Sequence, residues 1–323
     1  MAEILVFIEH FQGKVSDISY ISLAHAHTLA TSIGGKVIGV LLGSGIEPAA
    51  KDLLADEVLM IDDPSLADFI YDDHVAALAA LINEKQPRFM IFGDTSIGSD
   101  VAGGLSARLK IPLLSFCKEF IVEGGVPKFV AQICGGKILV EGGFPEGTSL
   151  VTMLPGKFKV NDGQSASPPK VTLYPLPSKE KPRLKLLEMI LPSDEDVDIS
   201  KEKILVAVGR GIENQDNVDM VKELADALGG VLCASRPVID QGWLSSSRLV
   251  GKSGKKVKPK LYLAMGISGA PEHVEAISDS EMIIAVNTDP RAPIFNVARF
   301  GTTENLLDLT DELILSIQEA KGA

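Results

Sequence analysis

The chain has 323 residues, of which 46% are hydrophobic and 23% are charged, a balance typical of a globular protein with more than one domain. Its formal net charge of -12 argues against nucleic-acid binding, because contacts to phosphate require a cationic surface. No uninterrupted apolar stretch approaches the roughly 20 residues of a membrane-spanning helix, so we expect no membrane insertion. We also expect no cleavable leader before the first apolar run.

Three cysteines, Cys117, Cys134 and Cys233, are far apart in the sequence and form no CxxC pair. This spacing favours neither a disulfide framework nor a zinc site. It indicates buried, inert thiols in a reducing compartment, so we expect a cytoplasmic protein.

The first part of the chain alternates apolar runs of strand length with helix-like segments. The runs are residues 4–8, 37–42, 58–61 and 89–92, and the helical segments are residues 19–31, 66–84 and 99–109. This alternation predicts a parallel sheet that is covered on both faces. Between residues 113 and 160, short alternating segments broken by Gly pairs predict antiparallel hairpins added to that sheet.

A charged, Pro-containing passage then ends near Ser200 and is the best candidate for a linker. After it the alternation restarts, with strands at 204–208, 231–234, 261–265 and 282–286 and helices at 218–228 and 304–319. We therefore predict an α/β protein with two doubly wound domains. The first covers residues 1–198, and the second, smaller one covers residues 199–323.

The tripeptide Gly251-Lys252-Ser253 matches the end of a P-loop, but the spacing around it does not. A P-loop requires Gly five residues before Gly-Lys, where this chain has Ser246. A GxGxxG motif is also absent, because Asn214 stands where a third Gly would follow Gly209 and Gly211. These departures argue against an NTP hydrolase and against an NAD site of the fingerprint type.

Turns rich in Gly, Ser or Arg follow three predicted strands of the second domain, at residues 208–211, 234–237 and 266–270. The carboxyl ends of strands in a doubly wound sheet meet at one crevice. Gly allows a ligand to approach the backbone, helix N-termini attract phosphate, and Arg210 and Arg236 add charge-assisted bonds. One such turn alone is typical of a tight strand–helix connection, whereas the three together favour a dinucleotide site.

His273 is the only histidine of the second domain and follows Pro271 at a predicted helix start. It is either a structural residue or a donor to developing negative charge. We find no metal-ligand spacing and no nucleophile–base arrangement, so we predict neither a metal nor a catalytic residue. The lysines between residues 252 and 260 follow no helical period and are interpreted as a solvated loop.

Several motifs of the chain resemble one known family. The segments ILVFIEH, VAVGRG, ASRPVIDQGW, VGKSGKKVKPKLYLAMGISGAPEH and IIAVNTDPRAPIFNVARFG are similar to the alpha subunit of electron-transfer flavoprotein, and the similarity runs essentially end to end. The resemblance implies that the second domain binds FAD and that the first packs against a beta subunit in a heterodimer.

By this resemblance the protein carries electrons from a flavin dehydrogenase, such as an acyl-CoA dehydrogenase of fatty acid oxidation. A membrane quinone reductase or a ferredoxin is the acceptor implied. The cofactor-binding residues carried over by position are Arg210, Ser235, Arg236, Val250, Gly251, Lys252, Ser253, Ser268, Gly269, Ala270, Pro271, Glu272, His273, Asn287, Asn305 and Leu306.

The resemblance also implies individual roles. Arg210 contacts the phosphate or adenosine side of FAD, and Arg236 lies near the isoalloxazine ring, where a cation raises the flavin potential. Ser253 replaces a Thr whose hydroxyl bonds flavin N5, and His273 stabilises negative charge at the O2 edge. Asn305 stands where an acid is common, which leaves the adenosine contact open.

Four departures from the family motifs, Lys252, Ser253, Pro271 and Glu272, suggest a specialised branch of the family, such as an electron-bifurcating complex in which the beta subunit carries a second FAD and reacts with NADH. A separate alternative, from another class of protein, is an adenine-nucleotide-binding module without redox function.

Overall fold

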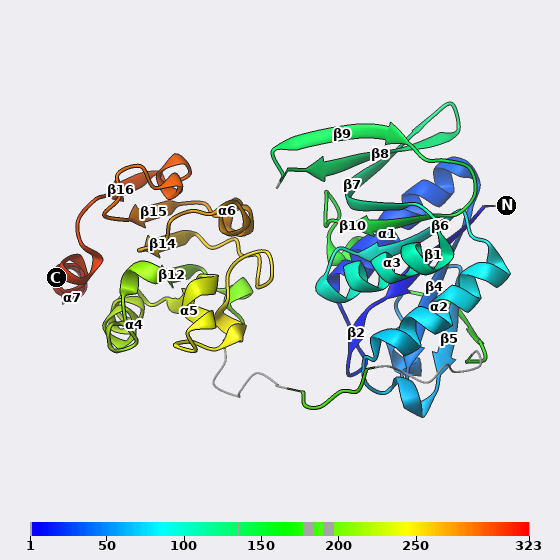
Figure 1. The fold of residues 1–323 in the computed structure, drawn as a ribbon, viewed down its shortest axis with the longest axis horizontal. Helices are drawn as coiled ribbons and strands as arrows, with labels where there is room; N and C mark the ends of the chain where they lie inside the picture. The colour runs from blue at the N-terminus through cyan, green and yellow to red at the C-terminus, as the bar shows by residue number, and fades with distance from the viewer. Residues whose placement is uncertain (1, 135, 177–183, 190–196, 323) are drawn as a thin grey trace. The chain divides into compact units, whose positions relative to one another are not determined.

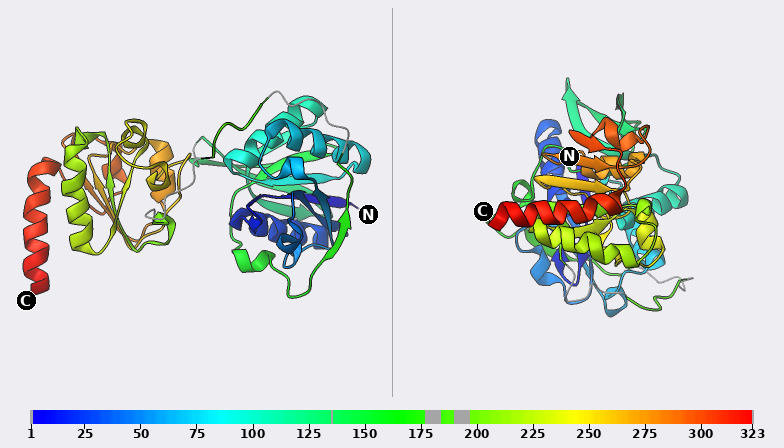
Figure 2. Two further views of the ribbon diagram at one scale, coloured as in Figure 1. Left: turned by 90° about the horizontal axis from the view of Figure 1, so that it is seen from below. Right: turned by 90° about the vertical axis from the view of Figure 1, so that its left-hand side faces the viewer.

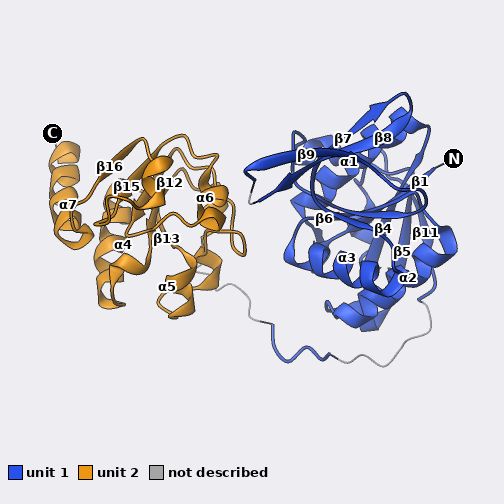
Figure 3. Ribbon diagram, turned by 45° about the horizontal axis from the view of Figure 1, so that its top comes forward, with its two compact units in different colours: residues 1–189 blue, residues 190–323 orange. Residues whose placement is uncertain are grey.

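The computed structural model describes residues 2–134, 136–176, 184–189 and 197–322. The chain divides into two compact units, residues 1–189 and 190–323 (Figure 3). Much of the charged passage expected to be a linker lies outside the described residues. The domain boundary after residue 198 therefore stays a prediction.

The first unit is built on a nine-stranded sheet in the order β11-β5-β4-β1-β6-β10-β7-β8-β9. Its strands are β1 (Glu3–Ile8), β4 (Lys36–Gly43), β5 (Glu57–Asp62), β6 (Phe89–Gly93), β7 (Leu113–Glu123), β8 (Val126–Ile133), β9 (Ile138–Gly143), β10 (Ser149–Met153) and β11 (Lys170–Leu173). The neighbours from β11 to β7 pair in parallel, while β7, β8 and β9 pair antiparallel. A parallel sheet with added antiparallel strands is confirmed. A separate short ribbon joins β2 (His10–Phe11) and β3 (Lys14–Val15).

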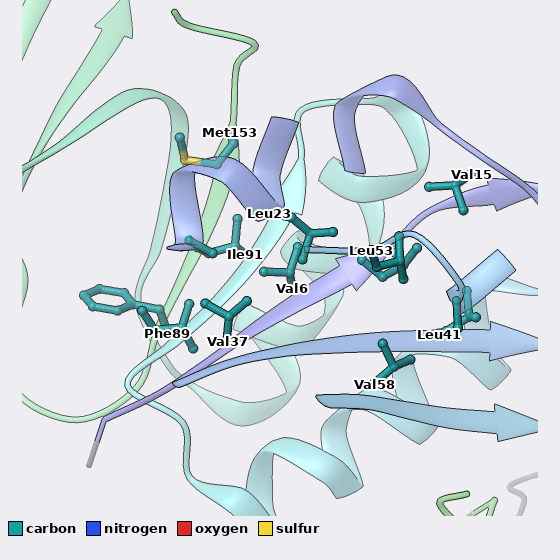
Figure 4. Packing of buried hydrophobic residues seen from close by; sticks show 14 of the residues in the cluster. Val6, Val15, Leu23, Val37, Leu41, Leu53, Val58, Phe89, Ile91 and Met153 are labelled. Carbon is teal, nitrogen blue, oxygen red and sulfur yellow. The ribbon is translucent and has the colours of Figure 1, made fainter. Parts of the chain in front are cut away.

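Helices cover both faces of this sheet, and the alternation of side chains along β1 decides which residues each helix meets. Leu23 of α1 (Asp17–Ile33) packs with Val6 and Ile91 on one face (Figure 4). On the other face, α2 (Tyr71–Lys85) and α3 (Ser96–Leu109) cover Leu5 and Phe7. The two layers of helix on either side of the sheet are visible in Figure 2. Burial on both faces explains why the central strands are continuously apolar.

Two strands depart from the sequence pattern. β10 lies in the segment expected to form only hairpins, yet it is a central, fully buried parallel strand between β6 and β7. β11 lies in the polar passage before the expected boundary and extends the sheet beyond β5. Its mostly exposed side chains give no burial pattern, so only its tertiary pairing reveals it.

The second unit is a five-stranded, fully parallel sheet in the order β13-β12-β14-β15-β16 (Figure 1). Its strands are β12 (Ile204–Val208), β13 (Val231–Ala234), β14 (Leu261–Met265), β15 (Ile283–Val286) and β16 (Phe300–Thr302), the last of which the sequence pattern did not predict. Its helices are α4 (Asp216–Leu228), α5 (Arg236–Asp240), α6 (Pro271–Ile277) and α7 (Leu306–Gly322). Helices α4 and α7 pack on one face, and α6 packs on the other. The prediction of a smaller doubly wound domain is confirmed.

Short 3-10 helices complete the connections, at Glu47–Ala50, Pro64–Leu66, Val160–Gly163, Ile199–Lys201, Arg210–Ile212, Ser246–Arg248 and Pro293–Asn296. Among the residues that the structure describes, no helix combines the length and the apolar character needed to cross a membrane.

Glu57 of β5 holds the edge strand β11 in place, and its ionisation makes the stability of the first unit depend on pH. Its carboxylate accepts from Lys36 Nζ at 2.6 Å and from Thr172 Oγ1 of β11 at 2.6 Å. These bonds lower the pKa of Glu57 to about 2. Since the folded pKa is depressed, this stabilisation is full above about pH 5 and is lost as the pH falls towards 2.

We therefore predict that Glu57→Gln lowers the free energy of unfolding by about 1 kcal/mol at pH 7 and flattens its decline between about pH 5 and 2. Denaturant unfolding across a pH series measures both effects. Glu123→Gln is the control, because Glu123 pairs with Lys128 on the exposed surface. An equal loss in the two variants would contradict this account.

Candidate functional site

Two glycine-containing turns contact each other at the point where the strand order of the second unit's sheet reverses. From β12 the chain passes to β13 on one side and then to β14 on the other, so the carboxyl ends of β12 and β14 form the switch point. There Gly209 N donates to Met265 O at 2.9 Å and Gly211 N donates to Gly266 O at 3.2 Å. A Cβ on Gly209 would lie 2.3 Å from Gly266 O, and one on Gly211 would lie 2.8 Å from Gly266 Cα. Only glycine allows these two turns to pack together.

The turn after β14 presents amide groups at this point. Gly266 and Gly269 have φ values of +67° and +84°, which favour glycine. Ile294 N donates to Ser268 O at 3.1 Å, and Asn287 Nδ2 donates to Ile267 O at 2.9 Å, so the turn is held from the β15 side. The amides of Ser268, Gly269 and Ala270 have no acceptor within the described residues. Three consecutive unpaired N–H groups in a glycine turn suit an anion such as a pyrophosphate.

The structure brings Arg236 and Ser253 together, although 17 residues separate them in the sequence. Arg236 follows β13, and its Nη1 donates to Ser253 Oγ at 3.0 Å. Its Nε donates to Asp240 Oδ1 at 2.6 Å, and about 60% of the side chain is exposed. The guanidinium therefore faces solvent beside a hydroxyl, while Asp240 fixes its orientation.

The loop between Val250 and Lys255 carries Ser253 and is closed on itself. Lys255 N donates to Leu249 O at 2.7 Å, and Gly254 N donates to Gly251 O at 2.9 Å. Val250 N anchors the loop to Ala234 O at the end of β13. The next element after this loop is the strand β14, so the loop does not have the strand–loop–helix geometry of a P-loop. Gly251, Lys252 and Ser253 instead form a surface turn at the edge of the sheet.

His273 lies in the first turn of α6 and is buried. Its Nδ1 lies 3.1 Å from Val250 O, and its Nε2 lies 2.9 Å from Tyr262 Oη. Burial lowers the pKa of His273 to about 4, so the ring is neutral at pH 7. Both ring nitrogens have protein partners, and a contact with flavin O2 would require one of them to change. That role stays a prediction.

The remaining predicted residues lie around the same edge. Arg210 and Asn305 are exposed, and Asn305 Oδ1 accepts from Leu307 N at the start of α7. Ser235 is buried, with its hydroxyl 3.4 Å from Val208 O. Leu306 is 5% exposed and packs in the core beneath Gly266, so its side chain has little surface for a ligand.

The exposed turn before α6 and the lysine-rich loop complete the surface. Pro271 and Glu272 are exposed, and a Cβ on Gly251 would lie 3.9 Å from Glu272 O. Lys255 pairs with Asp198 at 3.7 Å and Lys256 with Asp279 at 3.0 Å. These lysines are half exposed, as expected of a solvated loop.

Sequence reasoning missed Tyr262, which is indistinguishable from a core aromatic in the run LYLAM.

This geometry defines a class of protein: an α/β chain whose second domain presents unpaired amides and an arginine at the switch point of a parallel sheet, where dinucleotides bind. Comparison with known proteins identifies two matching family domains, one of which binds a dinucleotide. The Electron transfer flavoprotein domain matches residues 4–178, and the Electron transfer flavoprotein FAD-binding domain matches residues 198–278.

Several relatives align over nearly their full length. The chain is 37% identical to Protein FixB of Clostridium saccharobutylicum, covering 98% of this chain and 97% of that protein. It is 34% identical to Electron transfer flavoprotein subunit alpha of Thermoanaerobacterium thermosaccharolyticum, covering 99% and 98%. It is 32% identical to Acryloyl-CoA reductase electron transfer subunit beta of Anaerotignum propionicum, covering 99% and 97%.

The chain belongs to the electron transfer flavoprotein alpha-subunit family, and its cofactor is FAD. Its function is electron transport, and family membership implies a beta subunit and dehydrogenases as partners.

We predict that Gly209→Ala disrupts the switch point, because the added methyl group would overlap Gly266 O. The expected result is a loss of about 1–3 kcal/mol of unfolding free energy and much weaker FAD retention. Gly103→Ala is the control, since a Cβ there meets nothing within 4 Å and α3 gains helix propensity. Thermal unfolding and bound-flavin absorbance measure the two effects. Unchanged FAD retention in Gly209→Ala would contradict the role of this contact.

Proposed function

We propose that FAD binds along the carboxyl edge of the second sheet, with its pyrophosphate on the turn at residues 266–270. The observation that carries this proposal is the row of amides at Ser268, Gly269 and Ala270, which have no acceptor among the described residues, together with the Arg236–Ser253 pair. The residues would hold the cofactor without rearrangement of the strands, because each follows a strand end or lies in the adjacent loop. Bound FAD supplies the one- and two-electron chemistry that no side chain of the chain provides.

The chain's own residues would bind, orient and tune this cofactor. Asn287 and Ile294 hold the amide turn in place through backbone acceptors. The Arg236 guanidinium would place positive charge beside the ring, which favours its reduced, negatively charged forms. The Ser253 hydroxyl accepts from Arg236, so its own proton remains available to a ring nitrogen. Lys252, Glu272 and Arg210 would add charge at the exposed rim.

We further propose that the chain works as a heterodimer with a beta subunit in the cytoplasm and receives electrons from an acyl-CoA-oxidising dehydrogenase. A relative named as an electron transfer subunit of acryloyl-CoA reductase supports a partner that acts on acyl-CoA substrates. In the same proposal, the chain takes part in fatty acid oxidation and passes its electrons to an acceptor such as a membrane quinone reductase or a ferredoxin. One match to an FAD-binding domain, over residues 198–278, supports one FAD in this chain.

The test begins with the chain purified together with its partner subunit. We expect a yellow complex with one FAD per pair that a dehydrogenase reduces and NADH does not. A colourless complex that retains only adenine nucleotides would overturn the proposal. Two FAD per pair with reduction by NADH would favour a bifurcating complex.

In the same preparation we predict that Ser253→Ala weakens FAD binding about tenfold, the effect of one lost hydrogen bond of about 1.4 kcal/mol. Ser253→Thr keeps the hydroxyl and is the matched control, for which we expect affinity close to that of the parent chain. Titration of the deflavinated complex with FAD measures both constants. Equal affinity of the Ala and Thr variants would remove Ser253 from the site.

A further inference from the structure

Tyr262 is a core residue whose hydroxyl reaches toward the site. Its side chain on β14 is fully buried, and its Oη lies 2.9 Å from Nε2 of His273. The other ring nitrogen of His273, Nδ1, lies 3.1 Å from Val250 O. The contacts therefore link the middle of the sheet, through α6, to the loop that carries Ser253.

The direction of each hydrogen bond follows from donor and acceptor chemistry. A carbonyl oxygen only accepts, so Nδ1 of His273 carries the proton that points to Val250 O. In a neutral imidazole the second nitrogen is then an acceptor, and Tyr262 Oη–H donates to it. Burial lowers the pKa of His273 to about 4, which keeps the ring neutral at pH 7. This Nδ1–H tautomer is the less favoured one for a free histidine side chain in water.

Cys233 is another polar group in the core around Tyr262. It is fully buried on β13, and burial raises the pKa of its thiol to about 12, so it is protonated. A protonated thiol places no negative charge beside Tyr262, so the Tyr262 hydroxyl can give its own proton to His273.

The hydrogen bonds from Tyr262 through His273 end at the carbonyl oxygen of Val250. Its N–H donates to Ala234 O at 2.9 Å, and its carbonyl accepts from His273, so it is held between β13 and α6. The loop from Gly251 to Gly254 leaves directly from it. Inside that loop, Ser253 meets Arg236.

We propose that Tyr262 is a positioning residue. By donating to Nε2 it stabilises the Nδ1–H tautomer of His273 that the Val250 carbonyl also requires, and that tautomer holds Val250 so that Ser253 stays beside Arg236. The consequence for FAD rests on the proposed function of this loop, whereas the tautomer is a property of the chain without cofactor. A preformed loop binds more tightly than one that is correctly placed only part of the time.

The experiment uses the full-length chain with its partner subunit, deflavinated and labelled with ¹⁵N-histidine. His273→Gln assigns the His273 ring signals in nitrogen–proton correlation spectra. We expect the parent chain to show the Nδ1–H tautomer at pH 7. Tyr262→Phe keeps the ring shape but removes the donor to Nε2, and we expect it to weaken this tautomer preference and to bind FAD about tenfold more weakly.

Cys233→Ala is the matched control, because it removes another buried polar group next to Tyr262 but leaves the Tyr262–His273 bond. We expect it to lower stability while retaining the tautomer and the FAD affinity. If the parent chain shows the Nε2–H tautomer, or if Tyr262→Phe keeps both the Nδ1–H tautomer and the parent affinity, the proposal is overturned. If Tyr262→Phe does not fold, the tautomer of the parent chain still decides, since an Nε2–H ring would refute the assignment. If no form of the complex binds FAD, the proposed function fails while the tautomer result stands.

Discussion

The second domain depends on a contact between two backbones that no side chain could replace. Gly209 and Gly211 lie directly against Gly266, with hydrogen bonds across the switch point of the sheet. This contact sets where the turn after β14 leaves the sheet. The placement of the unpaired amides, the start of α6 and the buried ring of His273 all follow from it. A methyl group at these positions would separate β12 from β14 at the edge where the cofactor is proposed to bind.

The first domain has the same kind of switch point but different chemistry. There β1 and β6 are neighbours, and Thr95 Oγ1 donates to Glu9 Oε2 at 2.6 Å across their carboxyl ends. Asp94 accepts from Ser99 and Thr152, each at 3.0 Å. Carboxylates therefore occupy this edge where the second domain presents amides. Negative charge at such a position disfavours phosphate, which is consistent with one FAD site in the second domain alone.

The two parallel sheets could be predicted from the sequence because strands that are buried on both faces are continuously apolar. The runs at residues 4–8, 89–92 and 204–208 all became central parallel strands. β11 and β16 could not be predicted from the same signal, since their side chains are mostly exposed and only pairing with β5 and β15 defines them.

Sequence motifs could indicate only part of the candidate site. The Gly and Arg turns after the strands indicated which edge would bind a ligand. The hydrogen bond between Arg236 and Ser253 could not be predicted, because it depends on the tertiary position of the loop of residues 250–255. The side-chain partner of His273 was hidden for a related reason: Tyr262 sits within an apolar strand run, where a buried hydroxyl looks like any other core residue.

The measurement that tests the central claim most directly is amide hydrogen exchange of the complex of this chain with its partner subunit, with and without FAD. If the cofactor lies along the carboxyl edge of the second sheet, FAD will slow exchange at Ser268, Gly269 and Ala270 and in the loop of residues 250–255. Protection confined to the first domain, or no change at residues 266–270, would contradict the account.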